Sequence, residues 1–191
     1  MLKLFTEAFG EFLTAKLSDL PEKPVVSFAL PGAVAGQNAV NIFLTSLREN
    51  AGLRSNEQQY KREGPGWVAT IPPLRVTCTY IVSAWPCAED PTEAALSQQQ
   101  LLGAAYTAIA SAGSLPAAFI PAPMNTADLP APIIAISNDE LHQNPEFWTS
   151  AGCKFRPAFS FSAAVALPLS DGRFDYGVGE DGVKIGYRVN S

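Results

Sequence analysis

The 191-residue sequence contains few of the residues from which most catalytic and metal sites are built. It has one histidine, His142, and three cysteines, Cys78, Cys87 and Cys153. A catalytic triad or a histidine-based metal site would have to include His142, and no G-x-S-x-G or H-E-x-x-H pattern supplies the other residues. We therefore interpret His142 as a surface residue in a polar turn. We expect no metal and no cofactor.

The cysteines are too few and too scattered for a metal or disulfide framework. Their number is odd, and they lack the close spacing of a zinc site or of a small disulfide-linked domain. A reduced, cytoplasmic setting is the simplest interpretation. Acidic residues such as Glu89, Asp90 and Glu93 could pair for acid/base chemistry, but they lie where a helix is expected to begin and already interact favourably with its dipole.

An excess of positive charge and a long uncharged apolar run are also missing. Lysine and arginine total 13 against 18 aspartates and glutamates, which gives a formal net charge of -5. Nucleic acid is therefore not an expected partner, because its binding depends on basic patches. Residues 2–20 interleave Glu7, Glu11 and Lys16 with apolar side chains, unlike a signal peptide or a membrane span. We expect the mature chain to begin near Met1, and contact with a membrane stays open.

The sequence is rich in apolar residues, at 47%, which is enough for one buried core at this length. Hydrophobic periodicity predicts a mixed order of helices and strands, with two main helices. Residues 31–38 and the proline-rich stretch 116–132 are predicted connectors. The predicted helices are residues 2–20 and 89–111, residues 138–152 form a short broken helix, and the predicted strands are 24–30, 39–47, 72–85, 133–137 and 158–169.

Each long element has a face that we expect to be buried. Cys78 lies on such a face and is interpreted as a small core residue rather than a nucleophile, because a reactive thiol needs an exposed electropositive setting. The expected buried residues are Val26, Phe28 and Leu30 in the first strand, Val40, Ile42 and Leu44 in the second, Leu74, Val76, Cys78, Tyr80 and Val82 in the third, and Leu96, Leu101, Ala105 and Ile109 in the second helix.

The C-terminal stretch contains a G-x-G-x-x-G pattern at residues 177–182 that imitates a phosphate-binding loop. That motif requires a following helix, but only nine residues follow Gly182, and Glu180 and Asp181 would repel a phosphate. We therefore predict a β-hairpin over residues 172–190.

The predicted hairpin would be marginal on its own, because glycines weaken both arms and isolated hairpins rarely hold in water. We expect it to join the edge of its own sheet or that of a neighbouring subunit, as an assembly arm. The large apolar residues that argue for such packing are Phe174, Tyr176, Ile185 and Tyr187.

Residues 48–60 form a polar, charged segment directly after an apolar strand. A solvated loop is the ordinary interpretation of such a segment. The alternative is a protein interface, because Arg48 and Arg54 carry the planar, donor-rich head groups that interfaces favour, while the nearest lysine, Lys61, comes only directly after the segment.

Five pieces of the sequence resemble a known family when they are taken in order: "VNIFLTSLRENAGLRSNE", "PPLRVTCTYIVSAW", "EDPTEAALSQQQLLGAAYTAI", "FWTSAG" and "RPAFSFSAAVALPL". Together they resemble the N-terminal domain of the cap, or tail-terminator, proteins of extracellular contractile injection systems, which are phage-tail-like particles. The resemblance covers about residues 3–170, and its most specific piece runs from Arg48 to Glu57.

The resemblance implies a non-enzymatic assembly protein with a contractile-tail-terminator-like fold, which is an α/β fold of the α+β kind with a mixed β-sheet flanked by two main helices. Such proteins form a homo-oligomeric ring, a hexamer, that ends the inner tube and the contractile sheath, which would be the partners of this chain. The implied location is the cytoplasm, within the particle. The residues that match the family's signature are Arg48, Glu49, Asn50, Leu53, Arg54, Ser55, Asn56 and Glu57, with Arg75 and Tyr80 in the next strand and Glu146, Phe147, Trp148, Arg156 and Pro157 in a later motif. Our candidate subunit interface consists of Arg48, Glu49, Asn50, Leu53, Arg54, Asn56, Glu57 and Arg75.

The predicted organisation is a tail-terminator-like domain over residues 1–170 and a hairpin or arm over residues 171–191. Better-known caps in the family carry a longer C-terminal region that helps to engage the sheath, so whether this chain docks by that route stays open. Two other functions stay open. One is an assembly adaptor or chaperone of the same particle, and the other is a small-molecule-binding enzyme built around His142 or the glycine run.

Overall fold

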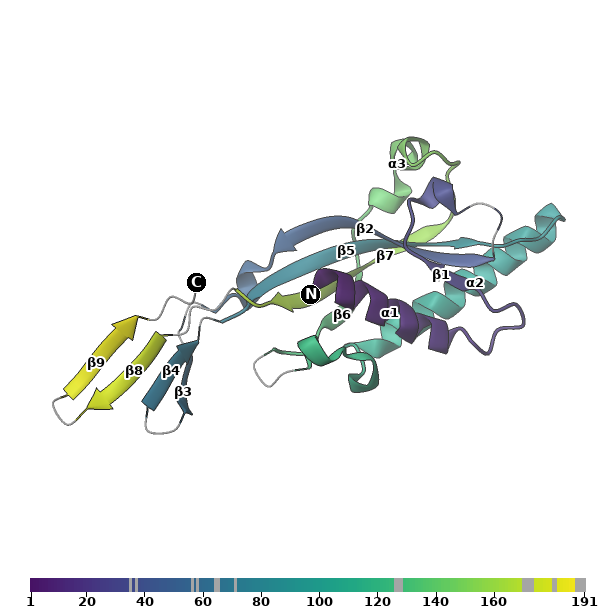
Figure 1. Ribbon diagram of the computed structural model, residues 1–191. Helices are drawn as coiled ribbons and strands as arrows, with labels where there is room; N and C mark the ends of the chain where they lie inside the picture. The colour runs from purple at the N-terminus through teal and green to yellow at the C-terminus, as the bar shows by residue number, and fades with distance from the viewer. Residues whose placement is uncertain are drawn as a thin grey trace.

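The computed structural model describes residues 1–34, 36, 38–55, 57, 59–63, 66–70, 72–125, 129–169, 174–179 and 182–187, with the backbone alone in the four strands of a second sheet. The main elements are two long helices, one short helix and two β-sheets (Figure 1). Their bounds are α1 Leu2–Lys16, β1 Val25–Ser27, β2 Ala39–Glu49, β3 Gln59–Glu63, β4 Gly66–Thr70, β5 Leu74–Trp85, α2 Pro91–Ala112, β6 Ile133–Ser137, α3 Pro145–Ser150, β7 Ala158–Leu167, β8 Phe174–Gly179 and β9 Gly182–Tyr187.

The central sheet is mixed, as the sequence predicts, with the order β1-β2-β5-β7-β6. Strand β1 runs parallel to β2, and the other neighbours are antiparallel. The longest strand, β5, lies in the middle, and its predicted inward face from Val76 to Val82 is buried. Cys78 is completely buried on that face, which confirms its core role. A central strand is shielded from both sides, so its apolar alternation translates directly into burial.

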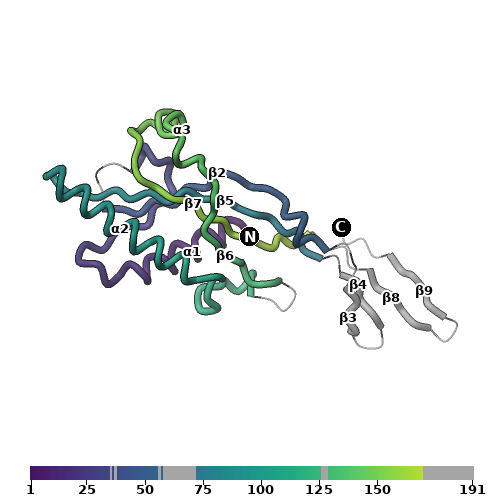
Figure 2. Tube along the Cα trace, turned by 180° about the vertical axis from the view of Figure 1, so that it is seen from behind, coloured from purple at the N-terminus to yellow at the C-terminus, as the bar shows by residue number. Residues whose placement is uncertain are grey.

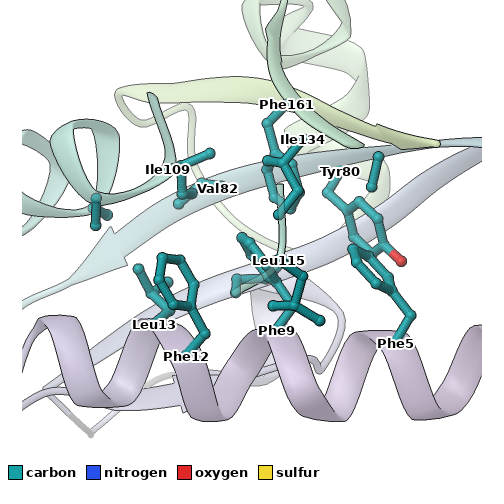
Figure 3. Packing of buried hydrophobic residues seen from close by; sticks show 14 of the residues in the cluster. Phe5, Phe9, Phe12, Leu13, Tyr80, Val82, Ile109, Leu115, Ile134 and Phe161 are labelled. Carbon is teal, nitrogen blue, oxygen red and sulfur yellow. The ribbon is translucent and has the colours of Figure 1, made fainter. Parts of the chain in front are cut away.

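Helices α1 and α2 cover one face of this sheet (Figures 1 and 2). Aromatic side chains fill the space between α1 and the sheet, as Figure 3 shows. The ring of Phe9 lies 4.7 Å from that of Phe161 on β7, and Phe161 stacks at 5.0 Å on Tyr80 of β5. Offset aromatic pairs of this kind stabilise a core beyond the area that they bury. The core of the protein therefore lies between the two helices and the sheet.

Helix α2 begins at a conventional N-cap. Asp90 accepts hydrogen bonds from the backbone N–H groups of Thr92 and Glu93, at 3.0 and 2.9 Å, and Pro91 occupies the first turn. The expected burial of Leu96 is wrong, because its side chain is 61% exposed. The first turns of α2 project past the end of the sheet, and among the described residues of this helix the fully buried ones begin at Leu101 (Figures 1 and 2).

The opposite face of the sheet is partly covered by α3 and the short turn before it. Trp148 is fully buried there and donates from Nε1 to the carbonyl oxygen of His142, at 2.8 Å. The His142 ring lies 3.1 Å, Nδ1 to Oγ, from Ser160 on β7. The interpretation of His142 as a surface residue needs correction, because the side chain is half-buried and hydrogen-bonds to the sheet.

The first strand is shorter than predicted. It ends at Ser27, and Phe28 and Leu30 are exposed rather than buried. The chain leaves the sheet at this point because the carbonyl of Ala29 accepts a hydrogen bond from the Asn41 side chain, at 2.9 Å, and the N–H of Gly32 bonds to the carbonyl of Ala151, at 3.1 Å. These contacts connect the segment to the α3 side of the molecule.

The second sheet has the order β3-β4-β8-β9. The predicted C-terminal hairpin is present as β8–β9, and β8 pairs with β4 of the same chain. The β3–β4 hairpin is not anticipated from the sequence. Glu49 pairs with Val76, and Leu74 pairs with Leu167. The end of β2, the start of β5 and the end of β7, from which the chain runs to and from the two hairpins, therefore all lie at one end of the central sheet. Both hairpins therefore leave from that end, where Figure 1 shows the second sheet.

Candidate functional site

The polar segment that resembles the family's signature begins at the end of β2 and turns away from the sheet. Asn50 holds this turn: its Oδ1 accepts from the N–H of Leu53 at 3.1 Å, and its Nδ2 donates to Oγ1 of Thr77 at 3.0 Å. The backbone N–H of Asn50 also donates to the carbonyl of Arg75, at 2.8 Å. Three hydrogen bonds from one residue fix the conformation of the turn, so Asn50 has a structural role within the chain.

The segment also contains an ion pair. Nη1 of Arg54 lies 2.8 Å from Oε1 of Glu49, and both side chains are about half exposed to solvent. An exposed pair of this kind contributes little to stability, typically less than about 1 kcal/mol. Its effect is to orient two opposite charges on the surface at the end of β2. Arg54 is therefore already engaged within its own chain.

The remaining candidate interface residues fall into two groups. Arg48, Leu53 and Glu57 are exposed, and Arg48 lies opposite Thr77 in the β2–β5 ladder, on the sheet face away from α1 and α2. Arg75 is only 8% exposed, and its buried Nε has no hydrogen-bond partner among the described residues. Asn56 lies outside the described residues. The exposed group alone is available for contact in a single chain.

The later family-matching motif is built into the packing. The guanidinium of Arg156 lies over the ring of Trp85, 3.7 Å from its centroid, and Nη1 donates to the carbonyl of Ala84 at 3.0 Å. Partial burial lowers the pKa of Arg156 from its ordinary value. Phe147 contacts Phe43 on β2, with the ring centroids 6.4 Å apart. This motif therefore attaches α3 and the residues just before β7 to the central sheet.

The four candidate residues of the assembly arm pair with one another in the β8–β9 hairpin of the second sheet. Phe174 lies opposite Tyr187, and Tyr176 lies opposite Ile185. Residues directly opposite each other in an antiparallel pair share a face, and alternate residues along a strand share it too. The backbone therefore places all four positions on the same face of the hairpin.

The structure also shows a feature that sequence reasoning missed, namely an open edge on β2. Strand β1 pairs only with Ala39, Val40 and Asn41. From Ile42 to Glu49, no described strand pairs with β2 on that side. A β-bulge at Thr45 interrupts the ladder with β5. No local pattern could have revealed the edge, because it depends on where β1 leaves the sheet.

Apolar side chains border this edge. Leu44 and Leu47 are 36% and 51% exposed, and Phe28 is 40% exposed. Phe28 lies against α1 at Gly10 and separates two surface grooves. One groove, of about 470 Å³, is lined by residues of α1 together with Phe28, Ile42, Leu44 and Tyr80. The other, of about 550 Å³, is lined by Val26, Phe28, residues of α1 from Glu7 onward, and Ser18 just after the helix.

The described residues offer little chemistry outside these surfaces. They contain no group of three or more histidine, cysteine or acidic side chains placed to hold a metal ion. Burial raises the pKa of Cys78 to about 11, the opposite of what a nucleophilic thiol requires. Burial also raises the pKa of Cys153, while Cys87 is exposed. Among the described helices, none has both the length and the apolar character needed to span a bilayer.

Two solved structures share this architecture. A PVC sheath/tube terminator of an extracellular contractile injection system, in its extended state, aligns with a TM-score of 0.64 at 20% identity, covering 100% of this chain and 62% of that one. The anti-feeding prophage cap, a tube-terminating cap, aligns with a TM-score of 0.61 at 19% identity, covering 98% of this chain and 58% of that one. The fold is therefore that of the terminator proteins of contractile injection systems.

The family follows from the sequence match. Residues 5–177 match the family described as the Pvc16 N-terminal domain, and the chain belongs to that family. This finding confirms the resemblance drawn from the sequence. The chain spans about three fifths of the length of the two solved chains. Comparison with curated proteins gives no match.

Proposed function

We propose that this protein is a structural cap subunit that ends the inner tube and sheath of a contractile injection system. The observation that carries the proposal is the family match over residues 5–177, on a fold shared with a sheath/tube terminator and a tube-terminating cap. The chemistry of the described residues agrees with a non-enzymatic role. The half-buried His142 hydrogen-bonds to Ser160, and the most buried thiol, Cys78, has a raised pKa.

The finer proposal is a closed ring of six copies, located at the particle end in the cytoplasm. A ring subunit must present two different, complementary patches, because a heterologous contact closes only when its rotation is fixed. The end of β2 supports this idea with the exposed Arg48 and with Glu49 and Arg54, which are oriented as a pair. We place one side of the subunit contact on this segment.

The test is to image particles made with and without this chain. With the chain, we expect tubes and sheaths of uniform length that end in extra density. Without it, we expect tubes or sheaths of irregular length and no terminal density. Uniform, normally ended particles in the absence of the chain would contradict the cap function. Dependence of particle assembly on the chain, with the chain itself missing from finished particles, would favour an adaptor instead.

A further inference from the structure

The open edge of β2 provides backbone groups for another strand. The N–H of Val25 donates to the carbonyl of Asn38, so that carbonyl points toward the β1 side. Backbone groups alternate in direction along a strand, so Ile42 and Leu44 direct theirs to the same side. Beyond Asn41, no described strand receives them. Exposed edges of this kind are templates for pairing with another chain.

The surroundings of the edge favour an extended segment with apolar side chains. Leu44 and Leu47 project on the helix-covered side of the sheet, in register with Tyr80 and Cys78, but α1 does not reach far enough to bury them. An added strand would lie between Leu44 and Phe28 and would remove both side chains from water. Strand addition combines main-chain hydrogen bonds with pockets for alternate side chains, and both are available here.

We propose that this edge, from Ile42 to Glu49, receives strand β9 of a second copy of the chain. The proposal rests on the proposed ring and specifies its contact. Strand β9 is the outermost strand of the second sheet, and within the described chain it pairs only with β8. It is six residues long, which is short enough to fit the open stretch of β2. Two open edges in one molecule can satisfy each other between copies.

The composition of β9 suits this edge. The sequence of β9, "GVKIGY", is mostly apolar, with one lysine, Lys184, and no acidic residue. The groove that contains Ile42 and Leu44 is lined by one pair of opposite charges, Lys3 and Glu7, which lie 3.5 Å apart on α1. Because these two charges balance each other, the groove favours a mostly apolar strand over a highly charged one.

The positions of the two edges also suit a ring. The acceptor edge belongs to the central sheet, and the donor strand belongs to the second sheet. A contact between two different patches of the same chain is heterologous, so it repeats from copy to copy and either closes into a ring or continues as a filament. Each subunit would donate one strand and accept one strand.

Disulfide cross-linking between two purified variants tests the contact directly. One variant carries Leu44→Cys, and the other carries Ile185→Cys, both with Cys87→Ser to remove the exposed native thiol. We expect a reducible covalent dimer only when the two are mixed, about tenfold above the Cys87→Ser parent. Because strand register is not specified, Val183→Cys and Tyr187→Cys are tested beside Ile185→Cys.

A charged-edge variant provides the matched control. Leu44→Lys with Leu47→Lys leaves the core untouched and places two lysines beside the edge, a common device for preventing strand pairing. We expect an unchanged melting temperature and a loss of at least about tenfold in association between copies. Leu96→Lys, on the exposed start of α2, makes the same chemical change away from the edge and should leave association intact.

The outcomes separate this inference from the cap function. A third variant carries both Leu44→Cys and Ile185→Cys in one chain, and a cross-link that forms only within single chains of this variant would overturn the inference. A cross-link from the cysteine of the Leu44→Cys variant to a tube or sheath protein would also overturn it. Particles capped at full occupancy by the doubly lysine-substituted protein would also overturn it while leaving the cap function standing. Cross-linked copies in solution, together with their absence from particle ends, would support the contact and contradict the cap function.

Discussion

Strand β2 passes through two contrasting regions of the molecule. At its start, Val40 lies between β1 and β5, and both Val40 and Ile42 are fully buried beneath the helices. A few residues later, Leu44 and Leu47 lie on the same side of the sheet and are exposed. All four positions carry apolar side chains. The comparison shows that the same residue type on the same face belongs to the core where a helix covers it and is left exposed where the helix ends.

The neighbouring strand β5 shows what makes the difference. From Val76 to Ser83 it has partners on both sides and helices above it, and the described side chains on its inward face are buried along that whole length. At its far end, β2 has a partner on one side alone in the described part of the chain. Burial therefore depends on coverage in three dimensions rather than on hydrophobicity.

The largest expected effect comes from weakening the covered region. Phe9→Ala removes a buried ring that packs against Phe161 at 4.7 Å, and we expect the free energy of unfolding to fall by about 3–5 kcal/mol. Leu44→Ala, in the open region, should lower it by about 1 kcal/mol or less. Chemical denaturation of both variants measures the difference. Equal losses would show that Leu44 belongs to the core and would abolish the contrast.

The next effect concerns association rather than folding. Arg48→Glu reverses an exposed charge at the end of the open region, and breaking a charge pair that is desolvated in the ring would cost about 2–5 kcal/mol per contact. Arg54→Glu also disrupts its pair with Glu49 and should act similarly on the ring. Mass measurement and particle-end occupancy report closure, and melting temperature reports the fold.

Lys154→Glu is the control for these variants, because it reverses an exposed charge beside the α3 region instead. We expect it to assemble like the parent. If the Arg48 and Arg54 variants also assemble like the parent, the segment is a solvated loop and the subunit contact lies elsewhere.

A smaller effect is expected where the loop after β1 meets the residues after α3. A Cβ atom added at Gly32 would collide with the backbone carbonyl of Ala151, which cannot move aside as a flexible side chain can. Overpacking of this kind typically costs about 1–3 kcal/mol, so Gly32→Ala should destabilise the protein by that amount. Gly103→Ala is a matched control, because a Cβ there meets no atom within 4 Å. Thermal unfolding that ranks the two variants equally would contradict this packing.

The smallest effect is chemical and leaves stability unchanged. Cys78 is buried in the covered region, and its pKa of about 11 leaves almost no thiolate near neutral pH, while Cys87 is exposed. We expect alkylation of the native protein at mildly alkaline pH to modify Cys87 first and Cys78 only after unfolding. Peptide mass mapping checks the order. Early modification of Cys78 would mean that the covered region opens readily.

Much of the architecture can be predicted from local patterns. Helix α1, strand β5 and the β8–β9 hairpin follow from periods of 3.6 and 2 residues and from turn residues, which act over short distances. The order of the quoted motifs was enough to predict the family, which the match over residues 5–177 confirms. The candidate interface residues at 48–57 could be named from the sequence, and their role in assembly stays a prediction.

The remaining features arise from contacts between residues that are distant in the chain. Strand β1 stops at Ser27 because Asn41 and Ala151 hold the following residues, and Leu96 is exposed because α2 outruns the sheet. The pairing of β4 with β8 joins residues about one hundred positions apart, and the open edge of β2 exists because β1 departs early. Periodicity specifies which side of an element is apolar, but only packing in space specifies what covers that side and what is left for a partner.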